Sequence, residues 1–213
     1  MARQPRTPKL RSRWLALLAG YGVPADRASV AFTALVAAYS EPHRHYHTLA
    51  HIERTLSTID RLRHLAADPQ AVELAAWLHD LVYDPTREDN ERQSAEHAAT
   101  LLRSLGLDPA TIARVQTLIL ATKAHQAGDD PDAAVLIDAD LASLAAPWDE
   151  FQADGQKIRQ EYVHLSEGAF RAGRAAVLRS FLARPHLYQT AKMRQSCEDA
   201  ARRNLARALA ELE

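Results

Sequence analysis

No segment of this sequence shows the sustained two-residue alternation of Val, Ile and aromatic residues that is typical of a β-strand. Apolar residues instead recur at helical spacing, as Ile52, Leu56, Ile59 and Leu62 do within 48–65. The composition is rich in Ala, Leu and Arg and includes only 7 Gly, which favours helix. The sequence therefore predicts an all-α fold.

Proline, glycine and capping residues divide the chain into a series of expected helices. The segment 70–81 is apolar almost all round, so we expect it in the middle of a helical bundle. Because the 213 residues contain no low-complexity linker and no internal repeat, residues 1–213 are expected to form a single domain, with about the first 10 disordered. The expected helices cover approximately residues 11–19, 25–39, 48–65, 70–81, 90–105, 109–123, 132–144, 151–162, 167–183 and 190–212.

Charge and cysteine content narrow the class of protein. The formal net charge of −1 gives no reason to expect a nucleic-acid polymer as a partner. No stretch approaches the roughly 18 apolar residues of a membrane span, and the apolar run 14–19 is too short for a secretory signal. Cys197 is the only cysteine, so a reducing, cytoplasmic location is the simplest interpretation. The sequence leaves the oligomeric state open.

Four of the 10 histidines lie in one short stretch, at His43, His45, His47 and His51. His47 and His51 are four residues apart, so on a helix they share one face. A lone His on a helix is usually structural or solvated, whereas a pair at this spacing suggests a site.

Acidic residues also occur inside strongly apolar segments. His79-Asp80 stands near the end of the most apolar expected helix, and Asp138 and Asp140 interrupt another apolar run. Burying an ionised Asp is costly unless something pairs with its charge. A divalent cation would satisfy imidazole and carboxylate together. Helix capping, or an Asp–His hydrogen bond in the core, is the alternative explanation.

The order of these residues resembles the H…HD…D signature of the HD superfamily, with His51, then His79-Asp80, then Asp140 on three separate expected helices. Residues 46–51, Tyr-His-Thr-Leu-Ala-His, resemble the Tyr-His-Asn-x-x-His of cyclic-nucleotide phosphodiesterases. In those enzymes the second His binds metal and the first donates a proton to the leaving group.

The segment around Asp140, the last acid of this signature, has a resemblance of its own. Residues 139–142, Ala-Asp-Leu-Ala, are similar to the segment around the last metal-binding Asp of the phosphodiesterases, which favours Asp140 over Asp138 as a ligand. Over nearly its whole length the chain also resembles a bacterial family described as predicted metal-dependent HD phosphohydrolases. The matching stretches agree in order and spacing and are 46–52, 77–84, 89–95, 122–125, 138–144, 159–162 and 198–205.

The resemblance implies an HD-type helical bundle and a hydrolase. The expected enzyme is a phosphohydrolase that cleaves a phosphate ester or anhydride, in a nucleotide or a related small phosphorylated metabolite. The expected cofactor is a divalent metal ion: Mn, Fe, Co, Ni, Zn or Mg. Its implied ligands are His51, His79, Asp80 and Asp140.

A second metal ion is possible but not implied. The phosphodiesterases carry a further His shortly after the HD pair that helps to organise a second metal, and 81–84 contains none. His97 and His125 are the candidates to supply its ligands, and His125 is equally a candidate phosphate contact. The same two residues would be needed for an alternative function, a di-iron HD-type oxygenase. A non-catalytic nucleotide-binding module is a further alternative.

In a phosphohydrolase, Asp80 can both bind metal and accept a hydrogen bond from the attacking water. His47 is the candidate proton donor to the leaving oxygen, or alternatively orients the substrate. Phosphate contacts are expected from Lys123, with Arg44 and Arg159 as further candidates, unless Arg159 is part of a solvated helix face.

The polar loop after the HD pair supplies other candidates for binding a sugar hydroxyl or metal-bound water. Asp84 and Glu91 are the stronger two, and Glu91 is also favoured by the dipole of the following helix. Asn90 is expected to cap that helix.

Overall fold

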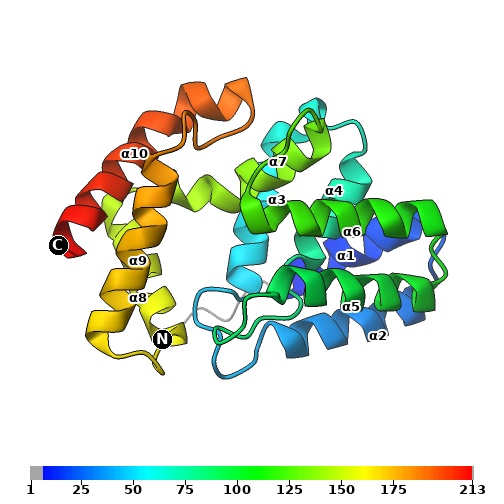
Figure 1. Cartoon of the computed structure of the whole chain (residues 1–213). Coiled ribbons are helices and arrows are strands. Elements are labelled where there is room, and N and C mark those ends of the chain that lie inside the picture. The colour runs from blue at the N-terminus through cyan, green and yellow to red at the C-terminus, as the bar shows by residue number, and fades with distance from the viewer. Residues whose placement is uncertain (1–6, 213) are drawn as a thin grey trace.

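The computed structural model describes residues 7–212, and within that range it contains α-helices, two short 3-10 segments and no strand (Figure 1). The predicted all-α, single-domain fold is confirmed. None of the described helices is both long enough and apolar enough to cross a membrane. The elements are α1 (Thr7–Gly20), α2 (Ala25–Ala38), α3 (Leu49–Leu62), η1 (Arg63–Leu65), α4 (Pro69–Leu78), α5 (Asn90–Leu105), α6 (Pro109–Ala124), α7 (Pro131–Asp140), η2 (Leu141–Ala145), α8 (Trp148–Glu161), α9 (Glu167–Leu182) and α10 (Ala191–Leu212).

Asp-Pro pairs start three of the helices. The side chains of Asp68, Asp108 and Asp130 each accept hydrogen bonds from backbone N–H groups in the first turn of α4, α6 and α7. Proline is suited to the next position because its φ angle is already helical and it has no N–H to leave unpaired. At the other end of α5, Gly106 adopts the left-handed conformation with φ 88°, as expected for a C-terminal cap.

Helix α4 lies at the centre of the bundle, as its almost uniformly apolar sequence predicts. It packs against α3, α6 and α7 and more lightly against α1 and α5. The Trp77 ring meets Trp14 of α1 edge-on at 5.5 Å between centroids, and Phe32 of α2 at 6.3 Å. Each large side chain buried in this way stabilises the fold by about 1.5–3 kcal/mol, and the packing holds the C-terminal end of α4 rigidly in place.

Several expected boundaries were wrong by three or more residues, and three of them matter for the core and the site. Helix α1 begins at Thr7 rather than near 11, because Leu10 is buried against the core; the rest of the segment expected to be disordered, 1–6, lies outside the described residues. Helix α4 ends at Leu78 rather than near 81, and α7 ends at Asp140 rather than near 144. The HD pair therefore follows the end of α4, and Asp140 is the last residue of α7.

Helices α8–α10 lie to one side of the other helices, at the left of Figure 1. The connection between α9 and α10 is tied to α7 by the buried Asp138 carboxylate, which accepts the backbone N–H of Gln189 at 2.6 Å and of Thr190 at 2.8 Å. Asn204 of α10 donates to the carbonyls of Leu144 and Ala146, both at 2.8 Å. These hydrogen bonds set the position of α8–α10 relative to the end of α7.

Replacing Asp138 with Ala is expected to destabilise the protein by about 2–4 kcal/mol, because the N–H groups of Gln189 and Thr190 lose their acceptors in a partly buried connection. The free energy of unfolding in urea measures this effect. Asp129→Ala, which removes an exposed loop carboxylate, is the matched control and should change it by less than about 0.5 kcal/mol. Equal stability of the two variants would contradict the role assigned to Asp138.

Candidate metal centre

Four side chains from three separate parts of the chain meet at one point. His51 lies in the first turn of α3, His79 and Asp80 follow the end of α4, and Asp140 ends α7. The Nε2 atom of His51 is 3.2 Å from Nε2 of His79 and 3.1 Å from Oδ1 of Asp140. The Nε2 atom of His79 is 3.1 Å from Oδ2 of Asp80 and 3.5 Å from Oδ1 of Asp140. The structure thus brings together all four residues that the sequence singled out as ligands.

These distances fit a shared metal ion. Ligand atoms about 2.1 Å from one cation lie about 3.0–3.4 Å from each other in octahedral or tetrahedral geometry. The separations among His51, His79 and Asp140 are 3.1–3.5 Å, and these three form a buried group that could hold an ion. Asp80 is slightly further from His51, at 3.6 Å. The set of two imidazole nitrogens and two carboxylates is one that first-row divalent metals accept.

A backbone carbonyl orients the imidazole of His79 within the cluster. Nδ1 of His79 lies 3.0 Å from the carbonyl oxygen of Ala76, so it donates its proton there. The proton on Nδ1 leaves the lone pair of Nε2 directed at Asp80 and Asp140. A histidine held in one tautomer by a backbone carbonyl is typical of metal sites.

The electrostatics of the cluster also favour a cation. Burial alone would raise the pKa of Asp80, but the imidazoles of His79, His47 and His51 lower it well below its ordinary value. The pKa of Asp140 is lowered in the same way, so both buried carboxylates stay ionised. Both also stand at helix C-termini, where the unpaired carbonyls carry partial negative charge.

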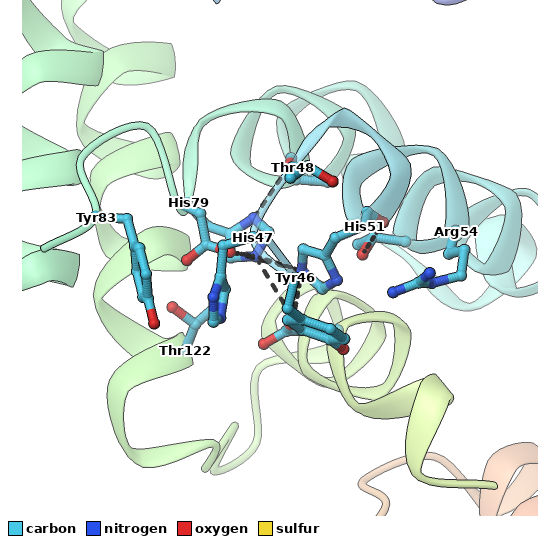
Figure 2. Close-up of polar contacts among 12 residues, drawn as sticks. Tyr46, His47, Thr48, His51, Arg54, His79, Tyr83 and Thr122 are labelled. Carbon is cyan, nitrogen blue, oxygen red and sulfur yellow. Dashed lines mark hydrogen bonds and ion pairs between the residues drawn. The ribbon is translucent and has the colours of Figure 1, made fainter. Parts of the chain in front are cut away.

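His47 lies beside His51 and His79 of this cluster (Figure 2). A buried glutamate, Glu161, holds it in place. Oε2 of Glu161, at the end of α8, is 2.7 Å from Nδ1 of His47 and accepts the Tyr83 hydroxyl at 3.0 Å. Its Oε1 accepts the backbone N–H groups of His45, Tyr46 and His47 at 2.7–2.9 Å. The Tyr83 ring stacks on the His47 ring at 4.1 Å. His47 is therefore restrained by a carboxylate and an aromatic face together.

The contact between His47 and Glu161 shifts the pKa of both side chains. Burial alone would lower the pKa of His47, but the negative charges of Asp80, Glu161 and Asp140 raise it overall. Burial alone would raise the pKa of Glu161, but its hydrogen bonds and charge interaction with His47 lower it to about 2. Glu161 was not among the candidate residues named from the sequence, although it lies in the stretch 159–162 that resembles the bacterial family.

A cavity of about 540 Å³ opens beside the cluster, between the α3–α7 part of the molecule and α8–α9. Its polar end includes His47, Glu91, His125 and Asp140, and the remainder is largely apolar. Two of the expected substrate-binding residues, Glu91 and His125, therefore line the same cavity as Asp140, one of the four candidate ligands.

His125 is held in an unusual conformation. It caps α6 with φ 50°, the only left-handed non-glycine residue in the described range 7–212. Its Nε2 lies 3.2 Å from Oδ2 of Asp140, the carboxylate oxygen that does not face His51. Left-handed backbone at such a residue is uncommon and is found at functional sites when the surroundings enforce it.

Arg44 is not a substrate-binding residue in this structure. Its guanidinium is buried and donates to the Glu41 carboxylate at 2.8 Å and to the carbonyls of Asp80 at 2.7 Å, Leu81 at 3.0 Å and His47 at 3.3 Å. With its donors directed at these groups, Arg44 positions the turn that carries the HD pair rather than contacting a phosphate.

Lys123 and Arg159 also lie apart from the metal cluster. The Lys123 ammonium is exposed and donates to the carbonyl of Glu88 at 2.8 Å. Arg159 donates to the carbonyls of Tyr162 at 2.8 Å and Leu165 at 3.2 Å, where it stabilises the end of α8. Neither residue lines the cavity that Asp140 and His125 line, so a phosphate contact from Lys123 or Arg159 stays a prediction.

The loop after the HD pair is organised by its own hydrogen bonds. Oδ1 of Asp84 accepts the N–H and hydroxyl of Thr86, at 2.9 and 2.7 Å, and Asp84 lines a different hollow from the one that Asp140 lines. Asn90 does not cap α5; its side chain pairs with the backbone of Asp84 at 2.8–3.0 Å. His97 is exposed and lines a different surface hollow, so it is not near His125.

The chain matches no protein-family model and no curated protein.

Replacing Asp140 with Ala is expected to weaken binding of a divalent metal by roughly 100-fold or more, because a charged ligand is lost from the cluster. Metal content after dialysis, and competition with a chromophoric chelator, measure the change. Asp138→Ala is the matched control, since it lies two residues away on α7 but binds the α9–α10 connection. Metal retained by the Asp140 variant at the wild-type level would contradict the site.

Glu161 should make stability depend on acid pH. Its pKa is about 2 in the folded protein against an ordinary 4.5, so its contribution is complete above about pH 4.5 and is lost as the pH falls towards 2. We expect Glu161→Gln to be less stable than wild type by on the order of 2 kcal/mol at pH 7, allowing for solvent screening, with a smaller difference at pH 2–3. Urea unfolding at several pH values tests this; a difference that does not change with pH would contradict it.

Proposed function

We propose that this protein is a metal-dependent phosphohydrolase of the HD superfamily, acting on a phosphate ester or anhydride of a nucleotide or related small metabolite. The observation that carries the proposal is the convergence of His51, His79, Asp80 and Asp140 beside a cavity that Asp140 and His47 line. The order of these residues along the chain, H…HD…D, supports the same assignment.

The cluster is the place where a cation would be held. A divalent ion such as Mn, Fe, Co, Ni, Zn or Mg would supply Lewis acidity there, lowering the pKa of water and polarising a phosphoryl oxygen. The two ionised carboxylates, Asp80 and Asp140, offset the charge of such an ion. Asp80, slightly further from His51 than the others, is also placed to accept a hydrogen bond from the attacking water.

His47 would protonate the leaving oxygen. Its Nδ1 proton is donated to Glu161, which leaves Nε2 as the nitrogen available to the cavity. Its raised pKa keeps a larger fraction of the imidazole protonated near neutral pH, and the buried carboxylate stabilises that charged form. After transfer of the Nε2 proton the neutral ring retains the Nδ1 hydrogen bond, so Glu161 acts as a positioning residue.

A second metal ion would have one ligand ready, because His125 adjoins the outer oxygen of Asp140. A di-iron oxygenase would need more histidines than this. His97, the other candidate, lines a different hollow, which favours hydrolysis over oxygenation.

The test is phosphate release from a panel of nucleotides and other phosphate monoesters with Mn, Co, Ni or Mg. We expect metal-dependent turnover, and a roughly 100-fold or greater loss of kcat in His47→Ala with metal content unchanged, because general acid catalysis is removed. His97→Ala, an exposed histidine outside the site, is the control and should keep wild-type turnover.

Other outcomes would assign other functions. Oxygen consumption by iron-loaded protein, with a mixed-valent spectroscopic signal and no phosphate release, would identify an oxygenase. Nucleotide binding without turnover, kept in His79→Ala, would identify a binding module. Either outcome would overturn the proposal.

A further inference from the structure

The cavity beside the metal cluster has an apolar wall that the proposed chemistry does not use. This wall comes from η2, α8 and α9, outside the segments that carry the metal ligands. It includes Leu144, Phe151, Ile158, Phe170 and Phe181. A cavity of about 540 Å³ with one polar end and an apolar wall is suited to a small molecule that is itself polar at one end.

One side chain on this wall is permanently charged. Arg174 of α9 lines the cavity and is partly buried. Its guanidinium has no hydrogen bond or ion pair to any residue in the range 7–212. Burial lowers its pKa, and only the hydroxyls of Tyr46 and Tyr162 act in the opposite direction. An arginine remains charged in spite of such a shift, so the cavity contains an unpaired cation.

Three acids line the cavity, Glu91, Asp140 and Asp154, and none of them forms an ion pair with Arg174. Asp154 pairs with Lys157 at 2.6 Å and with Arg54 at 3.4 Å. Asp140 faces His51 and His125. The five N–H donors of Arg174 are therefore left for something that enters the cavity.

Arg174 lies near the metal cluster. Tyr46 lines the same cavity as Arg174 and is close enough to influence its pKa, and the Tyr46 ring lies 5.2 Å from the ring of His51. Arg174 and Asp140 also line the same cavity. An anion held by Arg174 would thus lie at the end of the cavity where the proposed reaction takes place.

The chemistry of an arginine side chain indicates what kind of ligand Arg174 would bind. A charge withdrawn from water without a partner is unfavourable, and a bound anion relieves that cost. The planar guanidinium pairs best with two oxygens of one phosphate or carboxylate. Arg44 and Arg159 differ from Arg174 in this respect, because their guanidinium groups donate to protein groups.

We propose that Arg174 binds the phosphate group of the substrate, and that the wall formed by Leu144, Phe151, Ile158, Phe170 and Phe181 contacts an apolar or aromatic body joined to that phosphate. The substrate class is then an organic phosphate with an aromatic or aliphatic portion next to the phosphate. This inference rests on the proposed function, whose cavity it uses.

The experiment measures binding of phenylphosphonate, a non-hydrolysable anion with an aromatic ring, to the purified full chain by calorimetry. Arg174→Met is expected to weaken binding about 10-fold or more, because charge-assisted hydrogen bonds are lost. Arg174→Lys should recover part of the loss, since it keeps the charge but not the paired donors. Arg203→Met, an exposed arginine on α10, controls for net charge and should bind as wild type does.

Methylphosphonate tests the wall. Wild type should bind it about 10-fold more weakly than phenylphosphonate, because the ring contacts are missing. Equal affinity for the two probes would overturn the assignment of the apolar wall.

Thermal unfolding separates binding from a structural role. Arg174→Met should melt at the same temperature as wild type or higher, because it removes an unpaired charge. Loss of binding together with lower melting temperatures in both the Met and Lys variants would assign Arg174 a structural role and overturn the proposal. Absence of phenylphosphonate binding to wild type, or wild-type affinity in Arg174→Met, would also overturn it.

The two proposals fail separately. Arg174-dependent phenylphosphonate binding without phosphate release from any substrate would uphold the anion site and overturn hydrolysis. Phosphate release with unchanged kcat and KM in Arg174→Met would do the reverse.

Discussion

Two partly buried carboxylates facing two buried imidazoles are the constraint around which this structure is organised. Asp80 and Asp140 remain ionised in spite of burial, and each stands where a helix ends and its carbonyls add negative potential. Such an arrangement is unfavourable without a positive charge at its centre. The helices that bring it about must therefore be held firmly, and α4, buried among α3, α6 and α7, is held in that way.

Glu161 connects this cluster to the rest of the molecule. One carboxylate accepts three consecutive backbone N–H groups before α3, the Tyr83 hydroxyl and the imidazole of His47. Since Glu161 ends α8, the placement of the proposed proton donor depends on the C-terminal helices. Asp138 of α7 also ties the C-terminal helices to this part of the molecule, because it accepts hydrogen bonds from the α9–α10 connection. The α8–α10 part is consequently a component of the site.

The parts of the structure that could be predicted from sequence are those with local causes. Asp-Pro starts, a glycine cap and helical spacing account for the elements, and the H…HD…D order anticipated which residues meet. Arg44 was misassigned because its donors bind carbonyls distant in the chain, at Asp80 and Leu81, which no local pattern reveals. Arg174 was missed for the converse reason, that its lack of a partner is a property of the folded cavity.

The division of the cavity between two sets of helices has a functional consequence. Ligands for the cation come from α3, α4 and α7, whereas the apolar wall and its arginine come mostly from α8 and α9. Substitutions on α8 and α9 can therefore change what the cavity accepts while leaving the ligand cluster intact, provided that Glu161 and Asp138 keep the two sets in register. Under the proposed function, reaction chemistry and substrate selection would be carried by different segments, which the buried carboxylate of Glu161 joins.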